Sequence, residues 1–220
     1  MVVSLMVARR RLRLQTDERR SQLLELGVRL FSARRYEDIS IEDVAEAAGI
    51  SKGLLYHYFQ NKREFYIETV RAASLKLRRL TQPDLSLPPY SRLPAAIDAH
   101  LNYIQEHGPV YTAIYRSGVT IDPEVSAILE EHRDTVMTWI LKSYGITKPR
   151  PVLRSALRAW FGMVEAASLD WIENKALDRT ALRELLLAGY VATLSKAVEI
   201  DPKAARNFPS PSIRGRAARS

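Results

Sequence analysis

The chain has 220 residues, and its hydrophobic content of 46% is enough for a buried core in one large or two small domains. It contains no cysteine, which excludes disulfide bonds and thiolate metal sites and fits a reducing cytoplasm. No stretch approaches the ~20 apolar residues that span a bilayer, so we expect a soluble cytoplasmic protein with no membrane partner.

The net charge of +8 is concentrated at the two ends of the chain. Residues 1–79 contain 16 Lys and Arg against 10 Asp and Glu, and residues 201–220 contain 5 against 1, whereas residues 80–200 contain 12 against 14. A protein that meets nucleic-acid phosphates with one domain shows this asymmetry. A generally basic soluble surface is the alternative explanation.

The first 15 residues carry four arginines and no stable amphipathic pattern, so we expect a flexible basic arm. Such arms enter the minor groove of DNA in some proteins and are solvated tails in others, and the sequence leaves both roles open. The first helix is predicted from Asp17 to about Ala33, with apolar residues at helical spacing on its buried face.

Residues 40–59 are predicted to form two short helices joined by a glycine turn. Ser40 and Ser51 are placed to cap them, and Asp43 follows Ser40 at the spacing of a capping box. Gly49 supplies the left-handed conformation that ends the first helix. The arrangement is a helix-turn-helix.

Each of these two helices has an inward and an outward face. The residues predicted to pack inward recur at helical spacing and are Ile41, Val44, Ala45, Ala48, Leu55 and Phe59. The opposite face of the second helix combines charge, aromatic groups and bare backbone, in the form of Lys52, Gly53, Tyr56 and His57. That mixture suits the major groove of DNA.

The run from Val44 to Lys62, VAEAAGISKGLLYHYFQNK, resembles the DNA-binding signature of the tetracycline-repressor (TetR) family. The resemblance implies an all-α homodimer. Each chain of such a homodimer begins with a three-helix bundle that contains the helix-turn-helix. A larger C-terminal helical domain follows, which binds an effector and dimerises. It also implies a transcriptional regulator, usually a repressor that a small-molecule effector releases from a palindromic double-stranded DNA operator.

Eight residues are candidates for DNA contact. Lys52 and Gly53 lie at the end of the second helix that is directed at base edges, and Lys52 is equally suited to a guanine or a phosphate. The family resemblance implies phosphate contacts for Ser40, Tyr56 and Lys62. The predicted DNA-binding residues are Ser40, Ser51, Lys52, Gly53, Leu54, Tyr56, His57 and Lys62.

Prolines at helix starts and glycines at helix ends divide the rest of the chain. The predicted helices are 62–80, 95–107, 109–117, 123–144, 151–174 and 179–199, with an irregular proline-rich connection at 82–94. The expected domains are a basic flexible arm (1–15), a DNA-binding domain (16–62), an effector-binding and dimerisation domain (63–200) and a disordered basic tail (201–220).

The family places its effector cavity among the C-terminal helices, so histidine, aromatic and methionine side chains there are the ligand candidates. They are His100, Tyr103, His107, Tyr111, Tyr115, Trp139, Trp160 and Met163. Core packing is the alternative for each, because aromatic and methionine side chains commonly fill helical cores. His100 and His107 are two helical turns apart, about 10 Å, which is too far for one ion, so we expect no metal and no cofactor.

The helices predicted at 151–174 and 179–199 are apolar around much of their circumference. Small residues on them favour an intermolecular four-helix bundle with two-fold symmetry, and a buried pair within a monomer is the alternative. The predicted dimer interface is Ala159, Gly162, Ala166, Leu169, Leu182, Leu186, Gly189 and Thr193.

The sequence contains no Gly-x-Gly-x-x-Gly motif, no Walker-type loop and no Cys/His cluster, so we expect no enzymatic activity. Two functional alternatives remain beside the ligand-released repressor. One is an activator, and the other is a DNA-binding dimer without an effector pocket.

Overall fold

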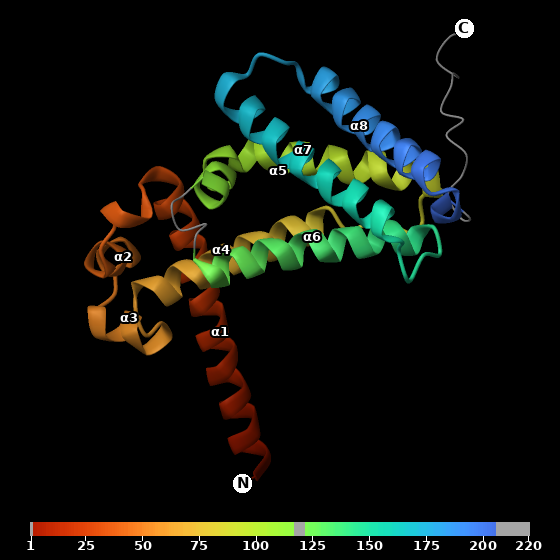
Figure 1. Cartoon of the computed structure of the whole chain (residues 1–220). Coiled ribbons are helices and arrows are strands. Elements are labelled where there is room, and N and C mark those ends of the chain that lie inside the picture. Colours follow the sequence, from red (N-terminus) through yellow and green to blue (C-terminus); the bar gives the residue numbers. More distant parts are fainter. Residues whose placement is uncertain (1, 117–121, 206–220) are drawn as a thin grey trace, which may run out of the picture. The chain divides into compact units, whose positions relative to one another are not determined.

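The computed structural model describes residues 2–116 and 122–205. Its helical elements are α1 (Val2–Ala33), η1 (Tyr36–Asp38), α2 (Ile41–Ala48), α3 (Lys52–Tyr58), α4 (Lys62–Leu80), α5 (Pro89–Arg116), α6 (Pro123–Ser143), α7 (Pro151–Asn174), α8 (Arg179–Ile200) and η3 (Pro202–Ala205) (Figure 1). These two ranges contain no strand, and the all-α fold class is confirmed. None of the helices described is long and apolar enough to cross a membrane.

The helices form two compact units. Unit 1 comprises Met1–Lys76 and Pro109–Leu129, and unit 2 comprises Leu77–Gly108 and Glu130–Ser220. Helices α4, α5 and α6 therefore each contribute residues to both units. This division differs from the predicted domains, because most of α4 and residues 109–116 and 122–129 pack with the helix-turn-helix rather than with the C-terminal helices.

The core of unit 1 joins distant parts of the sequence. Leu55 and Phe59 of α3, only 0% and 1% exposed, belong to one buried cluster with Phe65 of α4 and with Val125 and Ile128 of α6. The start of α6 is thus part of the hydrophobic core that supports the helix-turn-helix.

Gly27 lets α1 approach α4 closely. A Cβ atom at Gly27 would lie 2.4 Å from Thr69 Oγ1 and 2.7 Å from Phe65 Cζ, so only glycine fits at this crossing. The contact fixes α1 against the helix that follows the helix-turn-helix.

In unit 2, α7 and α8 run side by side (Figure 1). Trp160 of α7 donates from Nε1 to the Leu186 carbonyl at 2.9 Å, and its ring lies 5.1 Å from that of Tyr190. A Cβ atom at Gly189 would lie 2.5 Å from Met163 Sδ. The two helices therefore pack closely within one chain.

Several helix limits differ from those predicted. Helix α1 begins at Val2 rather than at Asp17, so the prediction of a flexible arm at 1–15 is wrong from Val2 onward. Residues 2–16 contain strong helix formers and neither glycine nor proline, and helix propensity there outweighs the missing amphipathic pattern. The predicted break between helices 95–107 and 109–117 is present as a kink within α5, where His107 has non-helical backbone angles (φ −127°, ψ 27°). Pro109 disturbs the helical hydrogen bonds there without ending the helix.

Helix α5 begins at Pro89 rather than at Ala95, so the irregular connection predicted at 82–94 is shorter, because proline fits the first turn of a helix. The other limits agree closely. Helix α4 and helix α7 have the predicted bounds, and α6 and α8 end within one residue of them. The predicted tail begins with η3, and its residues 206–220 lie outside the described ranges.

Candidate DNA-binding site

The helix-turn-helix has the predicted caps. Ser40 Oγ accepts from the Asp43 N–H at 3.0 Å, and the Asp43 carboxylate accepts from the Ser40 N–H at 2.8 Å. These hydrogen bonds lower the pKa of Asp43. Gly49 ends α2 in the left-handed conformation (φ 63°), and Ser51 caps α3 by accepting from the Leu54 N–H at 3.1 Å. The capping box and the glycine turn are confirmed.

Helix α3 has one buried and one exposed face. Leu55 is buried, as predicted, and Tyr58 packs partly against the core, whereas Tyr56 is 43% exposed. The exposed side chains and backbone of α3 are those of Lys52, Gly53, Leu54, Tyr56 and His57. The outward face therefore has the composition that the sequence predicted for DNA contact.

Lys52 has an acidic partner that the sequence prediction missed. Its Nζ donates to the Glu42 carboxylate of α2 and lies 5.8 Å from the centroid of the Tyr56 ring. The hydrogen bond lowers the pKa of Glu42 and raises that of Lys52. The Glu42 carboxylate thus partly neutralises the charge of Lys52. The only sequence signal for this pair is an acidic residue in the first turn of α2.

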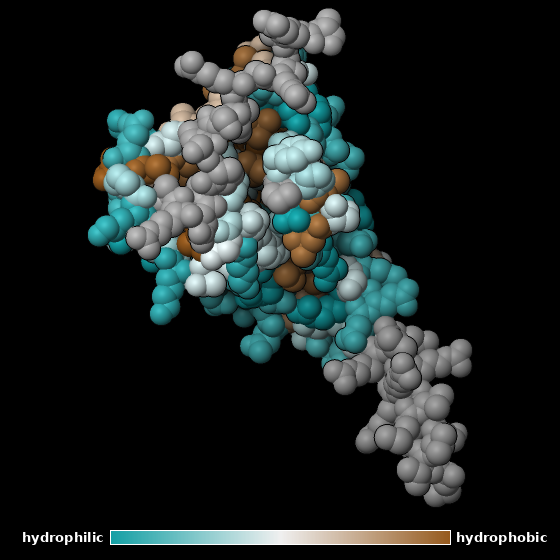
Figure 2. Space-filling model, turned by 90° about the vertical axis from the view of Figure 1, so that its right-hand side faces the viewer, coloured by the Kyte–Doolittle hydropathy of each residue, from teal (hydrophilic) through white to brown (hydrophobic). Residues whose placement is uncertain are grey.

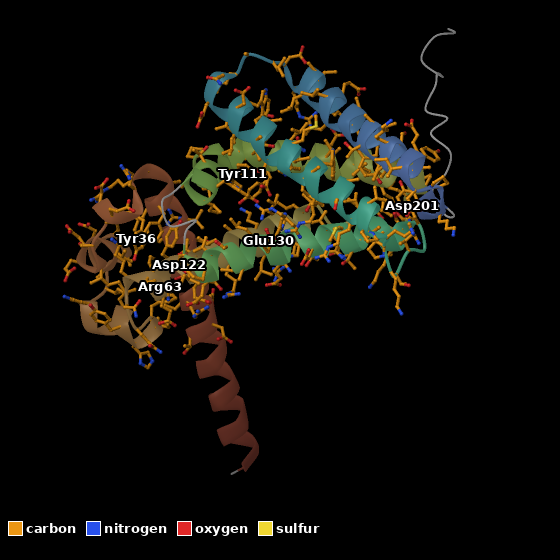
Figure 3. The ribbon with its side chains drawn as sticks, viewed as in Figure 1. Tyr36, Arg63, Tyr111, Asp122, Glu130 and Asp201 are labelled. Carbon is orange, nitrogen blue, oxygen red and sulfur yellow. The ribbon has the colours of Figure 1, made fainter. Side chains whose placement is uncertain are left out.

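A second ionic group lies where α4 begins. Lys62 is half-buried, with Nζ 4.1 Å from the centroid of the Tyr36 ring. The next residue, Arg63, donates from Nε and Nη2 to the two oxygens of Asp122, at 2.7 and 2.9 Å (Figure 3). Asp122 also accepts from the Glu124 N–H at 2.9 Å and so caps α6. Hydrogen bonding from Arg63 lowers the pKa of Asp122.

The effector candidates do not form one group. His100, Tyr103 and His107 lie on α5 in unit 2, and Trp139 is half-buried on α6 in the same unit. His100 Nε2 lies 2.9 Å from Ser168 Oγ, and Tyr103 is buried, which raises its pKa to about 12. These residues keep their predicted place among the C-terminal helices.

Four other effector candidates have neighbours that the sequence did not predict. Tyr111 and Tyr115 belong to unit 1, where Tyr115 packs on the helix-turn-helix core, because α5 passes from one unit to the other after Gly108. Trp160 and Met163 fill the packing between α7 and α8. Helical periodicity shows that such residues are buried but not which neighbours bury them.

Most residues of the predicted dimer face on α7 are exposed within the single chain. Ala159, Gly162 and Ala166 are exposed at helical spacing, and a Cβ atom at Gly162 would meet no atom within 4 Å. Leu169, the fourth member, is half-buried.

The predicted dimer face on α8 is wrong in part. Leu182 and Leu186 are 0% exposed within their own unit, Gly189 contacts Met163, and Thr193 is half-buried and donates to the Gly189 carbonyl. The exposed stripe is offset by one residue, or about 100° around the helix. It consists of Ala181, Leu185, Ala188 and Ala192. Hydrophobic side chains also reach the surface between hydrophilic ones in Figure 2.

Comparison with known proteins agrees with this geometry. Residues 23–69 match the family described as bacterial regulatory proteins of the tetR family, and residues 89–193 match the tetracyclin repressor-like C-terminal domain. The chain belongs to the TetR family. TetR-family regulators bind DNA and ligands and act as dimers.

Individual relatives of this TetR-family chain cover much of its length. It is 30% identical over 191 residues to the transcriptional activator FasR of Mycolicibacterium smegmatis, covering 80% of this chain and 83% of FasR. It is 30% identical over 131 residues to the transcriptional repressor KstR2 of Mycobacterium tuberculosis, covering 57% and 65%. A TetR-family regulator from Streptomyces coelicolor has a similar structure, with a TM-score of 0.77, 28% identity and 86% coverage of both chains.

These findings establish the general function. The TetR-family chain is a DNA-binding transcriptional regulator, and the families and relatives that it matches are regulators rather than enzymes.

Proposed function

We propose that this protein is a homodimeric repressor, which binds a palindromic operator in double-stranded DNA and leaves it when a small-molecule effector binds. The observation that carries the proposal is the outward face of α3, where Lys52, Gly53 and Tyr56 are exposed while Leu55 and Phe59 anchor the helix in the core. Because its partner is chromosomal DNA, we place it in the cytoplasm.

The residues of this face have separate roles. Lys52 and Gly53, at the N-terminal end of α3, approach base edges, and Leu54 offers an apolar contact for a thymine methyl group. Tyr56 and Lys62 contact phosphates, as does Ser40 at the start of α2, and these contacts set the register of the protein on the duplex. Ser51 and His57 complete the surface.

A dimer is needed because one helix-turn-helix buries little surface on DNA. Two of them, related by two-fold symmetry, reach half-sites about 34 Å apart, on successive turns of the major groove. The exposed small residues of α7 and α8 favour a four-helix interface between the two chains, since they allow helices to approach closely.

Ligand control requires a route from unit 2 to the DNA-reading helices of unit 1. Helices α4, α5 and α6 each contribute residues to both units, so a ligand that favours one conformer of unit 2 acts on helices that also belong to unit 1. A coupling free energy of typically ~1–3 kcal/mol is sufficient to change operator occupancy.

Transcription from the bound promoter tests the direction of control. The relatives include an activator and a repressor, so an activator is the second candidate. With the gene for this protein deleted, a repressor predicts increased transcription from that promoter, and an activator predicts decreased transcription. Regulation that is unaffected by any small molecule would instead favour a DNA-binding dimer without an effector pocket.

A further inference from the structure

Unit 2 contains a group of polar side chains that are buried or half-buried and that DNA binding does not use. Arg78, in the last turn of α4, donates from Nη1 to Glu131 at 2.9 Å and to Thr135 Oγ1 at 3.3 Å, and its side chain is only 15% exposed. Its Nε atom is buried and has no hydrogen-bond partner in the part of the chain that the structure describes. An unpaired N–H away from water costs free energy, which a bound acceptor would recover.

A second buried nitrogen lies near Arg78. Nδ1 of His132, on α6, has no hydrogen-bond partner among the residues of the two described ranges. Burial, together with the nearby charges of Arg78 and Arg133, lowers the pKa of His132 to about 4. The imidazole is therefore neutral at pH 7, and it has a free nitrogen close to a guanidinium group.

Two further helices contribute polar groups. His100 of α5 lies close enough to His132 for the two to interact electrostatically, and its Nε2 is 2.9 Å from Ser168 Oγ of α7. Burial and the neighbouring His132 lower the pKa of His100 to about 4. Arg133 is already engaged, because its guanidinium forms a two-point pair with Glu165 at 2.6 and 2.8 Å.

Apolar side chains predominate elsewhere in the buried parts of these helices. Leu101 and Ile104 of α5, Met137 of α6 and Phe161 of α7 are all buried. A ligand that reaches the polar group must therefore present an apolar body to these helices and an anionic end to Arg78.

We propose that Arg78 and His132, supported by His100 and Ser168, bind the carboxylate of an organic acid with an apolar body, and that this acid is the effector. The proposal rests on the proposed function. A carboxylate has two oxygens, so one ligand group can accept from Arg78 Nε and from His132 Nδ1. A carboxylate suits the site better than a phosphate monoester, because the phosphate carries almost twice the charge and Glu131 already neutralises part of the charge of Arg78.

The test is calorimetric titration of the full chain with butanoate, octanoate, dodecanoate and benzoate, each paired with its methyl ester, and with octyl phosphate. We expect at least one acid to bind about tenfold or more tightly than its ester and than octyl phosphate. Arg78→Gln and His132→Gln should weaken that acid about tenfold, or ~1.4 kcal/mol. Arg154→Gln, which removes an exposed arginine of α7, should leave the affinity unchanged.

Arg78→Lys keeps the charge but removes the Nε–H, so it should also lose affinity, and circular dichroism reports whether each variant folds. If Arg78→Gln does not fold, the acid affinities of Arg78→Lys and His132→Gln test the proposed site. Binding of no acid, equal binding of acid and ester, tighter binding of octyl phosphate, or unchanged affinity in Arg78→Lys and His132→Gln would overturn the proposal.

Binding to genomic DNA fragments, measured in parallel, separates the two proposals. If the protein binds DNA but none of the acids, the proposed regulatory function stands and the proposed carboxylate site is wrong. If the protein binds an acid through Arg78 and remains bound to DNA, the carboxylate site stands and release from DNA by this ligand is wrong.

Discussion

Arg63 at the start of α4 and Asp122 just before α6 form a two-point ion pair, with Nε–Oδ2 and Nη2–Oδ1 distances of 2.7 and 2.9 Å. The same carboxylate caps α6 through the Glu124 N–H. Because α4 follows α3 after three residues, the pair attaches the first turn of α6 to the DNA-reading segment. Helix α6 continues into unit 2 after Leu129, so a change there can reach α3 through this pair.

Substitution at Asp122 is predicted to destabilise unit 1. Asp122→Ala removes both the ion pair and the cap, and loss of a cap alone costs about 0.5–2 kcal/mol. Arg63→Ala leaves the cap in place and should have the smaller effect. Urea unfolding measures both. Equal stability of Asp122→Ala and the wild type would show that the pair does not hold α6 in place.

The pH dependence of stability provides a second readout for Asp122. Its pKa is lowered in the folded protein, mainly by Arg63, so the pair stabilises the fold above the unfolded value of 3.8. This contribution is lost as the pH falls through the lower, folded pKa. Asp122→Asn should therefore reduce the loss of stability on acidification below about pH 4. An unchanged acid profile would contradict the assigned pair.

Because Glu42 and Lys52 form an ion pair, substitutions at the two positions should change the salt dependence of DNA affinity in opposite directions. Lys52→Ala removes a cation from the DNA face and should reduce the slope of log affinity against log salt by up to about 0.9. Glu42→Gln frees Lys52 to neutralise a phosphate, so the slope should steepen and the affinity for all DNA sequences should rise. Fluorescence anisotropy with labelled duplexes measures both slopes.

Glu25→Gln is the matched control, because it makes the same charge change at an exposed position of α1. If it increases DNA affinity as much as Glu42→Gln does, the effect is one of net charge and the pairing with Lys52 is irrelevant.

Two glycines in unit 1 should separate folding from DNA binding. Gly27→Ala places a Cβ atom against Thr69 and Phe65 and should cost about 1–3 kcal/mol of stability. Gly53→Ala meets only Ser51 Oγ, at 4.0 Å, so its stability should be unchanged or higher while its DNA affinity falls, because backbone approach to the groove is blocked. Thermal unfolding and DNA titration are the two measurements. Normal DNA binding by Gly53→Ala would remove this glycine from the interface.

The sequence predicts the helix-turn-helix well because its determinants are local. Ser40 with Asp43 and the left-handed Gly49 act within a few residues, and the buried Leu55 and Phe59 follow the helical period. Glu42 as the partner of Lys52 depends on the angle between two helices, which no local pattern specifies. For the same reason, the sequence did not indicate that Asp122 is bound to Arg63.

The C-terminal helices show the limit of periodicity. Helix α8 is apolar around much of its circumference, so the pattern does not show that Leu182 and Leu186 face α7 while Leu185 and Ala188 face outward. The unpaired atoms of Arg78 and His132 depend on how four helices meet. The effector candidates taken from the sequence were mainly aromatic residues, so they did not include Arg78.

The dimer face is predicted to lie on the exposed stripes of α7 and α8. Gly162→Arg and Ala188→Arg place a long cation on these stripes and should yield monomers, since the two-fold axis presents each change twice. Thr138→Arg, at an exposed position of α6, is the control and should remain dimeric. Gly189→Arg is unsuitable because its side chain would collide with Met163 in the same chain. Light scattering measures the mass, and dimeric Gly162→Arg and Ala188→Arg proteins would exclude this interface.

Selection of genomic fragments by the purified protein, followed by sequencing, tests the central claim that a symmetric dimer reads DNA through α3. The account predicts enrichment of one inverted repeat, with half-site centres about 34 Å apart, and a relaxed preference at one position of each half-site with Lys52→Ala. Enrichment of a sequence without two-fold symmetry, or an identical sequence preference for Lys52→Ala and the wild type, would contradict it.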